Sequence, residues 1–160
     1  YMALKKVNEI LNNKKYKEYL KRLEELESTR EFCRHNIEHF LDVARIAYII
    51  NLEEELGFSK DIIYAIGLLH DIGRVLEYEK GIQHHEGSVI LAKIILDETS
   101  FTLDERNCIL KAIDEHRQES EDELSKLIYK SDKLSRNCFG CEVEDKCYWP
   151  KKKKNLKIKY

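Results

Sequence analysis

One apolar run that ends on a histidine and an aspartate constrains the fold of this chain most strongly. The run covers residues 62–69 and is followed by His70, Asp71 and the segment Ile72-Gly73-Arg74. An imidazole and a carboxylate at the end of a buried helix are costly unless a partner compensates them. A divalent metal ion is the simplest such partner. The run therefore predicts a buried helix with a metal site at its end.

Residues that break helices are scarce in the rest of the chain. The 160 residues include one proline and six glycines, which favours long helices over many short strands. Apolar periodicity and capping residues predict helices over residues 3–13, 14–27, 35–56, 59–69, 85–96, 102–115 and 121–135, with a loop over 74–83. We therefore expect an all-α bundle of about six to seven helices. Its expected parts are N-terminal helices (1–30), a core (31–137) and a C-terminal segment (138–160).

Charge and hydropathy narrow the possible partners and the compartment. The 28 basic and 30 acidic residues give a net charge of −2, which makes nucleic acid an unlikely partner. The charged N-terminal stretch does not look like a signal peptide, and the longest apolar runs are too short to span a bilayer. We expect a cytoplasmic protein with no membrane partner. The lysine-rich last ten residues are interpreted as a solvated terminus, with binding of RNA or an acidic partner as the alternative. The oligomeric state is left open.

More candidate metal ligands stand on either side of the His-Asp pair. They are His39 in an amphipathic helix, the adjacent His84 and His85, His116 at the end of a predicted helix, and Asp132 in the last one. His35 stands four residues before His39, and such a pair can lie on one helix face and clasp a metal ion. Because His35 lies near the expected helix start, we interpret it as a cap-region or substrate-side residue.

This series of residues resembles the HD superfamily of metal-dependent phosphohydrolases, in which a histidine, a His-Asp pair and a distant aspartate hold the metal. The resemblance covers about residues 35–135 and implies an HD-domain helical bundle. The implied ligand set is the six-residue pattern of the binuclear members, with the aspartate of the pair bridging two ions: His39, His70, Asp71, His84, His116 and Asp132. In similar families a histidine often stands four residues before a small residue, which favours His84, four before Ser88, over His85. Length and ligand order are similar to the YqeK family, which hydrolyses dinucleoside tetraphosphates.

The resemblance also implies a reaction. Mixed histidine and carboxylate ligands suit Fe, Mn, Zn or Co, and a metal-bound hydroxide would attack a nucleotide or another small phosphoester. Cations must then stabilise the charge that develops on phosphorus. The candidates are Arg74, Lys80, Arg117, Lys133 and Arg136. Arg74 and Lys133 are preferred, and are named with Asp71 as catalytic residues, because each lies within three residues of an expected ligand. The alternatives are a di-iron oxygenase and a non-enzymatic nucleotide or redox sensor.

A cysteine-rich segment follows the region of resemblance. Cys138 and Cys141 are separated by two residues, the spacing of a metal knuckle, and Cys147 follows. Cys33 is the candidate fourth ligand, because it lies just before His39 and Cys138 lies just after Asp132. Zinc is the first expectation and an iron–sulfur cluster the second, with free thiols or a redox pair as the alternative. The fifth cysteine, Cys108, is expected in the core.

Overall fold

The computed structural model describes residues 2–116 and 120–160 and is all-helical over them, as expected. Its first four helices are α1 (Lys5–Leu11), α2 (Lys14–Leu26), α3 (Ile37–Glu53) and α4 (Lys60–Leu69). The other four are α5 (Arg74–Lys80), α6 (His84–Leu96), α7 (Leu103–Glu115) and α8 (Glu123–Leu134), followed by short 3₁₀ turns η1 (Cys138–Gly140) and η2 (Glu144–Lys146). No helix in the described ranges is long and apolar enough to cross a membrane.

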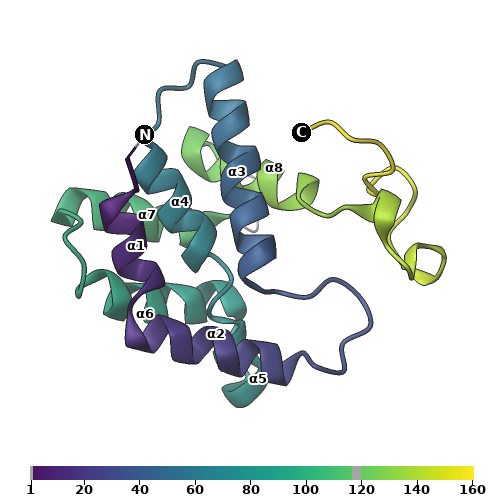
Figure 1. Ribbon diagram of the computed structural model, residues 1–160, viewed down its shortest axis with the longest axis horizontal. Helices are drawn as coiled ribbons and strands as arrows, with labels where there is room; N and C mark the ends of the chain where they lie inside the picture. The colour runs from purple at the N-terminus through teal and green to yellow at the C-terminus, as the bar shows by residue number, and fades with distance from the viewer. Residues whose placement is uncertain (1, 117–119) are drawn as a thin grey trace.

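Helix α4 lies at the centre of the bundle, with α1, α3, α7 and α8 packed around it (Figure 1). Every residue from Ile62 to Leu69 except Tyr64 is buried. A helix that is apolar on all sides is stable only when other helices surround it. The end of the apolar run therefore points His70 and Asp71 into the protein interior.

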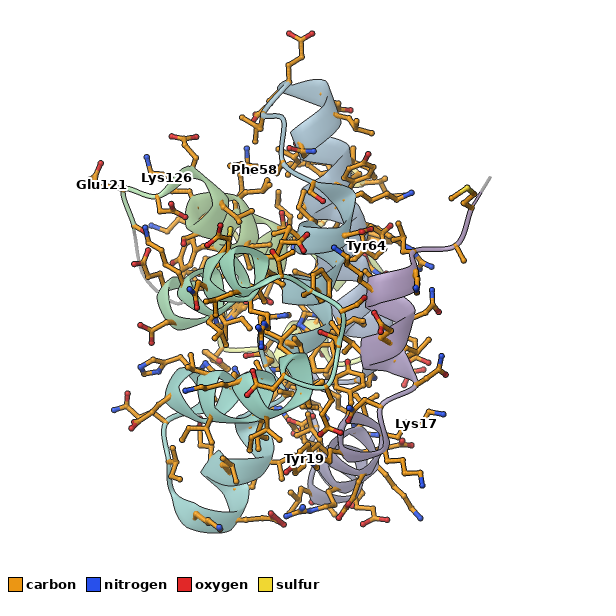
Figure 2. All side chains as sticks on the ribbon, turned by 90° about the vertical axis from the view of Figure 1, so that its left-hand side faces the viewer. Lys17, Tyr19, Phe58, Tyr64, Glu121 and Lys126 are labelled. Carbon is orange, nitrogen blue, oxygen red and sulfur yellow. The ribbon has the colours of Figure 1, made fainter. Side chains whose placement is uncertain are left out.

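The N-terminal helices belong to the same core as the rest of the bundle. Val7 and Ile10 of α1 and Tyr16 and Leu23 of α2 are buried in one cluster with α4. Lys17, one residue after Tyr16, projects outward from α2 (Figure 2). This alternation of buried and solvent-facing side chains is what the amphipathic pattern predicts.

Helix α5 occupies the segment that the sequence predicts as a loop, so that prediction is wrong. Only Val75 and Leu76 of its seven residues are buried, too few to show a helical period in the sequence. These two side chains are covered because α5 packs between α2 and α6. The helix ends at Gly81, whose φ of +71° is a left-handed conformation that glycine adopts readily.

Two details of α7 can be compared with the sequence prediction. The predicted capping box is confirmed, since the Thr102 hydroxyl accepts from the Glu105 backbone N–H and the Glu105 carboxylate accepts from that of Thr102. The expectation that Cys108 lies in the core is wrong, because its side chain is exposed. The buried stripe of α7 starts one residue later, at Ile109.

Candidate metal centre

The end of α4 is built so that its carbonyl groups are satisfied while one imidazole nitrogen stays available. The backbone N–H of His70 donates to the Ile66 carbonyl (2.8 Å), and His70 Nδ1 lies 2.8 Å from the Gly67 carbonyl oxygen. The hydroxyl of Tyr16, from α2, donates to the Leu68 carbonyl (2.7 Å). Because the carbonyl of Gly67 can only accept, Nδ1 must carry the proton. The lone pair of His70 Nε2 is therefore free to bind a cation.

A close helix crossing places His39 beside this end of α4. A Cβ added to Gly67 would lie 2.7 Å from the Cβ of Ala44, so only glycine lets α3 approach α4 this closely. His39 lies five residues before Ala44, at the first turn of α3, where the Asn36 side chain caps the helix by accepting from the His39 N–H (2.9 Å).

A second close approach places His84 beside Asp71. A Cβ on Gly73 would lie 1.9 Å from the backbone nitrogen of Ser88, and the Gly73 N–H donates to the Ser88 hydroxyl (2.8 Å). A glycine and a small hydroxyl residue thus let the first turn of α6 pack against the turn after α4. This contact explains physically why a small residue four positions after His84 matters.

Four of the expected ligands form one group, contributed by the start of α3, the end of α4 and α8. Ligand atoms of His39, His70, Asp71 and Asp132 all lie within 4.8 Å of one another. Asp132 Oδ1 is 3.3 Å from His39 Nε2 and 3.7 Å from His70 Nε2. Asp71 Oδ2 is 3.5 Å from His70 Nε2.

The other oxygen of Asp71 faces a second group, formed with His84 and His116. Asp71 Oδ1 lies 3.6 Å from His116 Nε2 and 3.9 Å from His84 Nε2. His85 is in neither group. The structure thus brings together all six residues of the expected ligand set and gives Asp71 one oxygen for each group.

Several of these atoms are buried and lack a hydrogen-bond partner among the described residues: His39 Nε2, His70 Nε2 and Asp71 Oδ1. Leaving buried polar atoms unpaired is costly, so their concentration at one point fits a bound cation. The ring nitrogens that point away from the centre do have hydrogen-bond partners. His116 Nδ1 lies 2.5 Å from the Ile113 carbonyl oxygen, and His39 Nδ1 lies 3.3 Å from the Ser135 hydroxyl. Such outer hydrogen bonds orient histidine ligands in metal sites.

The protonation states of His39, His84, Asp71 and Asp132 also suit metal binding. For His70, burial is outweighed by the charges of Asp71 and Asp132, which raise its pKa, so a metal ion would displace the proton that they stabilise there. Burial lowers the pKa of His39 to about 4, and burial together with Arg74 lowers the pKa of His84 to about 4. Burial opposes ionisation of Asp71 and Asp132, but neighbouring histidines outweigh it and hold both pKa values well below the usual range. Neutral imidazoles and ionised carboxylates are the forms that bind metal.

Sequence reasoning missed two carboxylates that hold histidines at this site. Glu77 of α5 lies 2.9 Å from His84 Nδ1 through Oε2, and it was hidden because its segment was expected to be a loop. Glu27, which is 2 % exposed, accepts from the His35 backbone N–H (2.6 Å) and lies 2.7 Å from His35 Nδ1. No pattern in the sequence indicates that this glutamate, which follows the charged helix α2, is buried.

His35 itself faces the metal groups without joining them. Its Nε2 lies 3.8 Å from Asp71 Oδ2, and its ring contacts that of His39 edge-on. It stands just before Asn36, the N-cap of α3, and lines the cavity above Asp71. This position agrees with the expected place near the start of the helix.

A cavity of about 180 Å³ opens onto Asp71 and Asp132. Four basic side chains line it: Arg30, Arg74, Lys133 and Arg136. Three aromatic side chains complete its walls: Phe32, Tyr148 and Trp149. We call this cavity the cleft. Of the other cations expected from the sequence, Lys80 is exposed at the end of α5, and Arg117 lies outside the described residues.

The cysteines of the C-terminal segment lie next to the cleft. Cys33, Cys138, Cys141 and Cys147 line a second cavity, also of about 180 Å³. Their sulfurs are more loosely grouped than the histidine and carboxylate atoms of the two groups above. Cys33 and Cys147 line both cavities.

Comparisons with known proteins agree with this geometry. Residues 36–137 match the family model described as HD domain. A protein from Clostridium beijerinckii, described as uncharacterized, is 48% identical over 153 residues, which are 96% of this chain and 98% of that protein. No solved structure matches the chain.

Proposed function

Because the chain belongs to the HD-domain family, we propose that it is a metal-dependent phosphohydrolase that acts on a nucleotide or another small phosphoester. The observation that carries this proposal is the cleft, in which four basic side chains surround Asp71 and Asp132 of the metal centre. The positive charge of these side chains, next to the residues that would hold metal, would attract the phosphate group of a substrate.

Two divalent transition ions fit the two groups of ligand atoms. The first would be held by His39, His70, Asp71 and Asp132, and the second by His84, His116 and the other oxygen of Asp71. When bound by these residues, such ions would lower the pKa of water toward neutrality and supply a hydroxide nucleophile. Mixed nitrogen and oxygen ligands favour Fe, Mn, Zn or Co over thiolate-selective metals.

Basic residues of the cleft would bind and polarise the phosphate. Arg74 Nε lies 3.5 Å from Asp71 Oδ1, so its guanidinium stands beside one of the oxygens that would hold the second ion. Lys133 follows Asp132 directly and lines the same cleft. Both positions suit stabilisation of negative charge that develops on phosphate oxygens. The proposal therefore gives Arg74 and Lys133 catalytic roles beside Asp71.

The aromatic wall supports a nucleotide over a simple phosphate ester. The ring of Phe32 meets that of Tyr148 edge-on, with centroids 6.3 Å apart, and Tyr148 is 80% exposed. Exposed aromatic rings offer a nucleobase a surface for stacking, which contributes about 1–3 kcal/mol per base. A nucleotide would therefore place its phosphate at the metal centre and its base against this aromatic wall, within the same cleft.

The test combines metal analysis with a substrate screen. We expect the chain, purified without a metal-affinity column, to contain transition metal and to release phosphate from nucleotides or dinucleoside polyphosphates. Asp71→Ala should lose both ions and all turnover, whereas Asp114→Ala, which removes an exposed aspartate of α7, should keep both. Bound iron with oxygen consumption and no phosphate release would establish the oxygenase instead. Tight nucleotide binding without turnover would establish the sensor.

A further inference from the structure

The C-terminal cysteines meet Cys33 although they are far apart in the sequence. Cys33 belongs to the loop between α2 and α3, whereas the other three follow α8. All four line one cavity of about 180 Å³, and none is in a disulfide. Figure 1 shows the segment after α8 on the same side of the bundle as the α2–α3 loop.

The local backbone around the C-terminal cysteines forms two tight turns. The 3₁₀ turn η1 begins at Cys138, and the Cys141 N–H donates to the Cys138 carbonyl (3.2 Å). The second turn, η2, ends directly before Cys147. Two cysteines separated by two residues across such a turn have the spacing by which zinc knuckles supply two thiolates to one ion.

The surroundings of the cysteines are suited to negative charge. Four thiolates on one Zn²⁺ carry a net charge of −2, which needs compensation when it is partly buried. The side chain of Lys154 lines this cavity and is 8% exposed, and its ammonium donates to the Glu144 carbonyl (2.7 Å) and carboxylate (2.9 Å). Arg136 lines the cavity as well, and the Trp149 N–H donates to Cys147 Sγ (3.5 Å).

From these observations we propose that Cys33, Cys138, Cys141 and Cys147 bind one structural Zn²⁺, separate from the histidine and carboxylate centre. On binding zinc the four sulfurs draw together into tetrahedral coordination and release their protons. The ion cross-links the C-terminal segment to the α2–α3 loop. Because the linked cysteines are far apart in the sequence, this cross-link constrains most of the unfolded chain and so raises the free energy of unfolding.

The zinc site also has a consequence for the cleft, and this part rests on the proposed function. Cys33 and Cys147 line the cleft too, and Tyr148 and Trp149 follow Cys147 directly. The ion therefore holds the aromatic wall in place over Asp71 and Asp132. Loss of zinc should raise KM for a nucleotide more than it lowers kcat, because the wall contacts the base and the metal centre contacts the phosphate.

Elemental analysis of the full chain tests the site independently of activity. We expect Cys141→Ser to lose one zinc per chain while the metal bound by the histidines is retained. Cys108→Ser, which changes an exposed cysteine of α7 outside the cavity, should lose none. In cobalt-substituted protein, the thiolate-to-cobalt absorption should disappear in Cys141→Ser and persist in Asp71→Ala. A zinc content unaffected by Cys141→Ser would overturn the proposal.

The unmodified protein supplies a measurement that does not depend on variant folding. Titration of its thiols with an organomercurial should release one zinc to a chromogenic chelator as the four cavity thiols react, whereas the exposed Cys108 should react without releasing zinc. Release of no zinc, recovery of the four cysteines as disulfides, or iron with acid-labile sulfide would each overturn the zinc assignment. Failure of the phosphohydrolase screen would leave these zinc measurements unchanged, so the two proposals fail separately.

Discussion

At the residue scale, the candidate centre depends on which atom of each side chain is left free. Asp71 turns one oxygen to each group of ligand atoms, with Oδ2 toward His70 and Oδ1 toward His84 and His116. The histidines use Nδ1 for outer hydrogen bonds and turn Nε2 inward. A change to an outer partner should therefore alter metal affinity without removing a ligand.

Glu77→Gln is expected to weaken binding at the group of Asp71, His84 and His116 by about 10–100-fold. The glutamate fixes the His84 ring and makes it more basic, and an amide does so less well. Competition titrations with a metal chelator measure the affinity. Glu79→Gln is the control, because Glu79 lies on the same helix but pairs with Arg22. Equal affinities in the two variants would contradict the orienting role of Glu77.

Tyr16→Phe is expected to lower the free energy of unfolding by about 1–3 kcal/mol, because the buried Leu68 carbonyl loses its donor. Denaturant unfolding measures this change. Tyr19→Phe, on the same helix and partly exposed, should change stability by less than about 0.5 kcal/mol. If both variants were equally stable, the Tyr16 hydroxyl would not support the end of α4.

At the element scale, two glycines determine how closely helices approach the centre. Gly67 lets α3 cross α4 against Ala44, and Gly73 lets α6 begin against the turn after α4. Each approach brings one histidine to the His-Asp pair, His39 in the first case and His84 in the second. The two groups of ligands should therefore respond separately to changes at the two crossings.

Gly73→Ala is expected to weaken the Asp71, His84 and His116 group and to leave the His39, His70 and Asp132 group more nearly intact. The added Cβ would lie 1.9 Å from the Ser88 nitrogen, so the start of α6 must move away. Metal stoichiometry should fall from two ions toward one at the centre. Lys93→Ala is the control, because Lys93 is an exposed residue of the same helix α6. Retention of both ions with full affinity would refute this account of the crossing.

At the scale of the whole molecule, the expected ligands come from α3, the turn after α4, α6, the end of α7 and α8. One centre thus connects helices from most of the chain. An ion that binds only the folded state stabilises it by mass action. Metal occupancy and global stability should therefore change together.

Removal of metal by a chelator is expected to lower the free energy of unfolding. For one site, protein in free metal at 100 times Kd is stabilised by about 2.7 kcal/mol, and the chelator should remove this stabilisation. Thermal unfolding with and without metal measures it. Asp132→Asn should unfold at a lower temperature than the unmodified chain in metal and respond less to the chelator. A melting temperature independent of metal in the unmodified chain would mean that no ion joins these helices.

The sequence by itself determined the fold class, most helix positions and the residue types of the candidate site. Apolar periodicity records which side of a long helix is buried, and the capping box of α7 records where it begins. The histidines and aspartates were recognisable because such side chains at the ends of apolar helices are costly without a partner. These are local properties, so they can be read along the chain.

Only the tertiary structure decided which of these residues meet and what supports them. Helix α5 forms because α2 and α6 cover its two buried residues, and with it Glu77 reaches His84. Glu27 is buried because it lies against His35 from the following loop. The cleft is lined by four separate segments, residues 30–35, 71–74, 132–136 and 147–149. Such contacts join residues distant in sequence, and no local pattern of hydropathy or spacing encodes them.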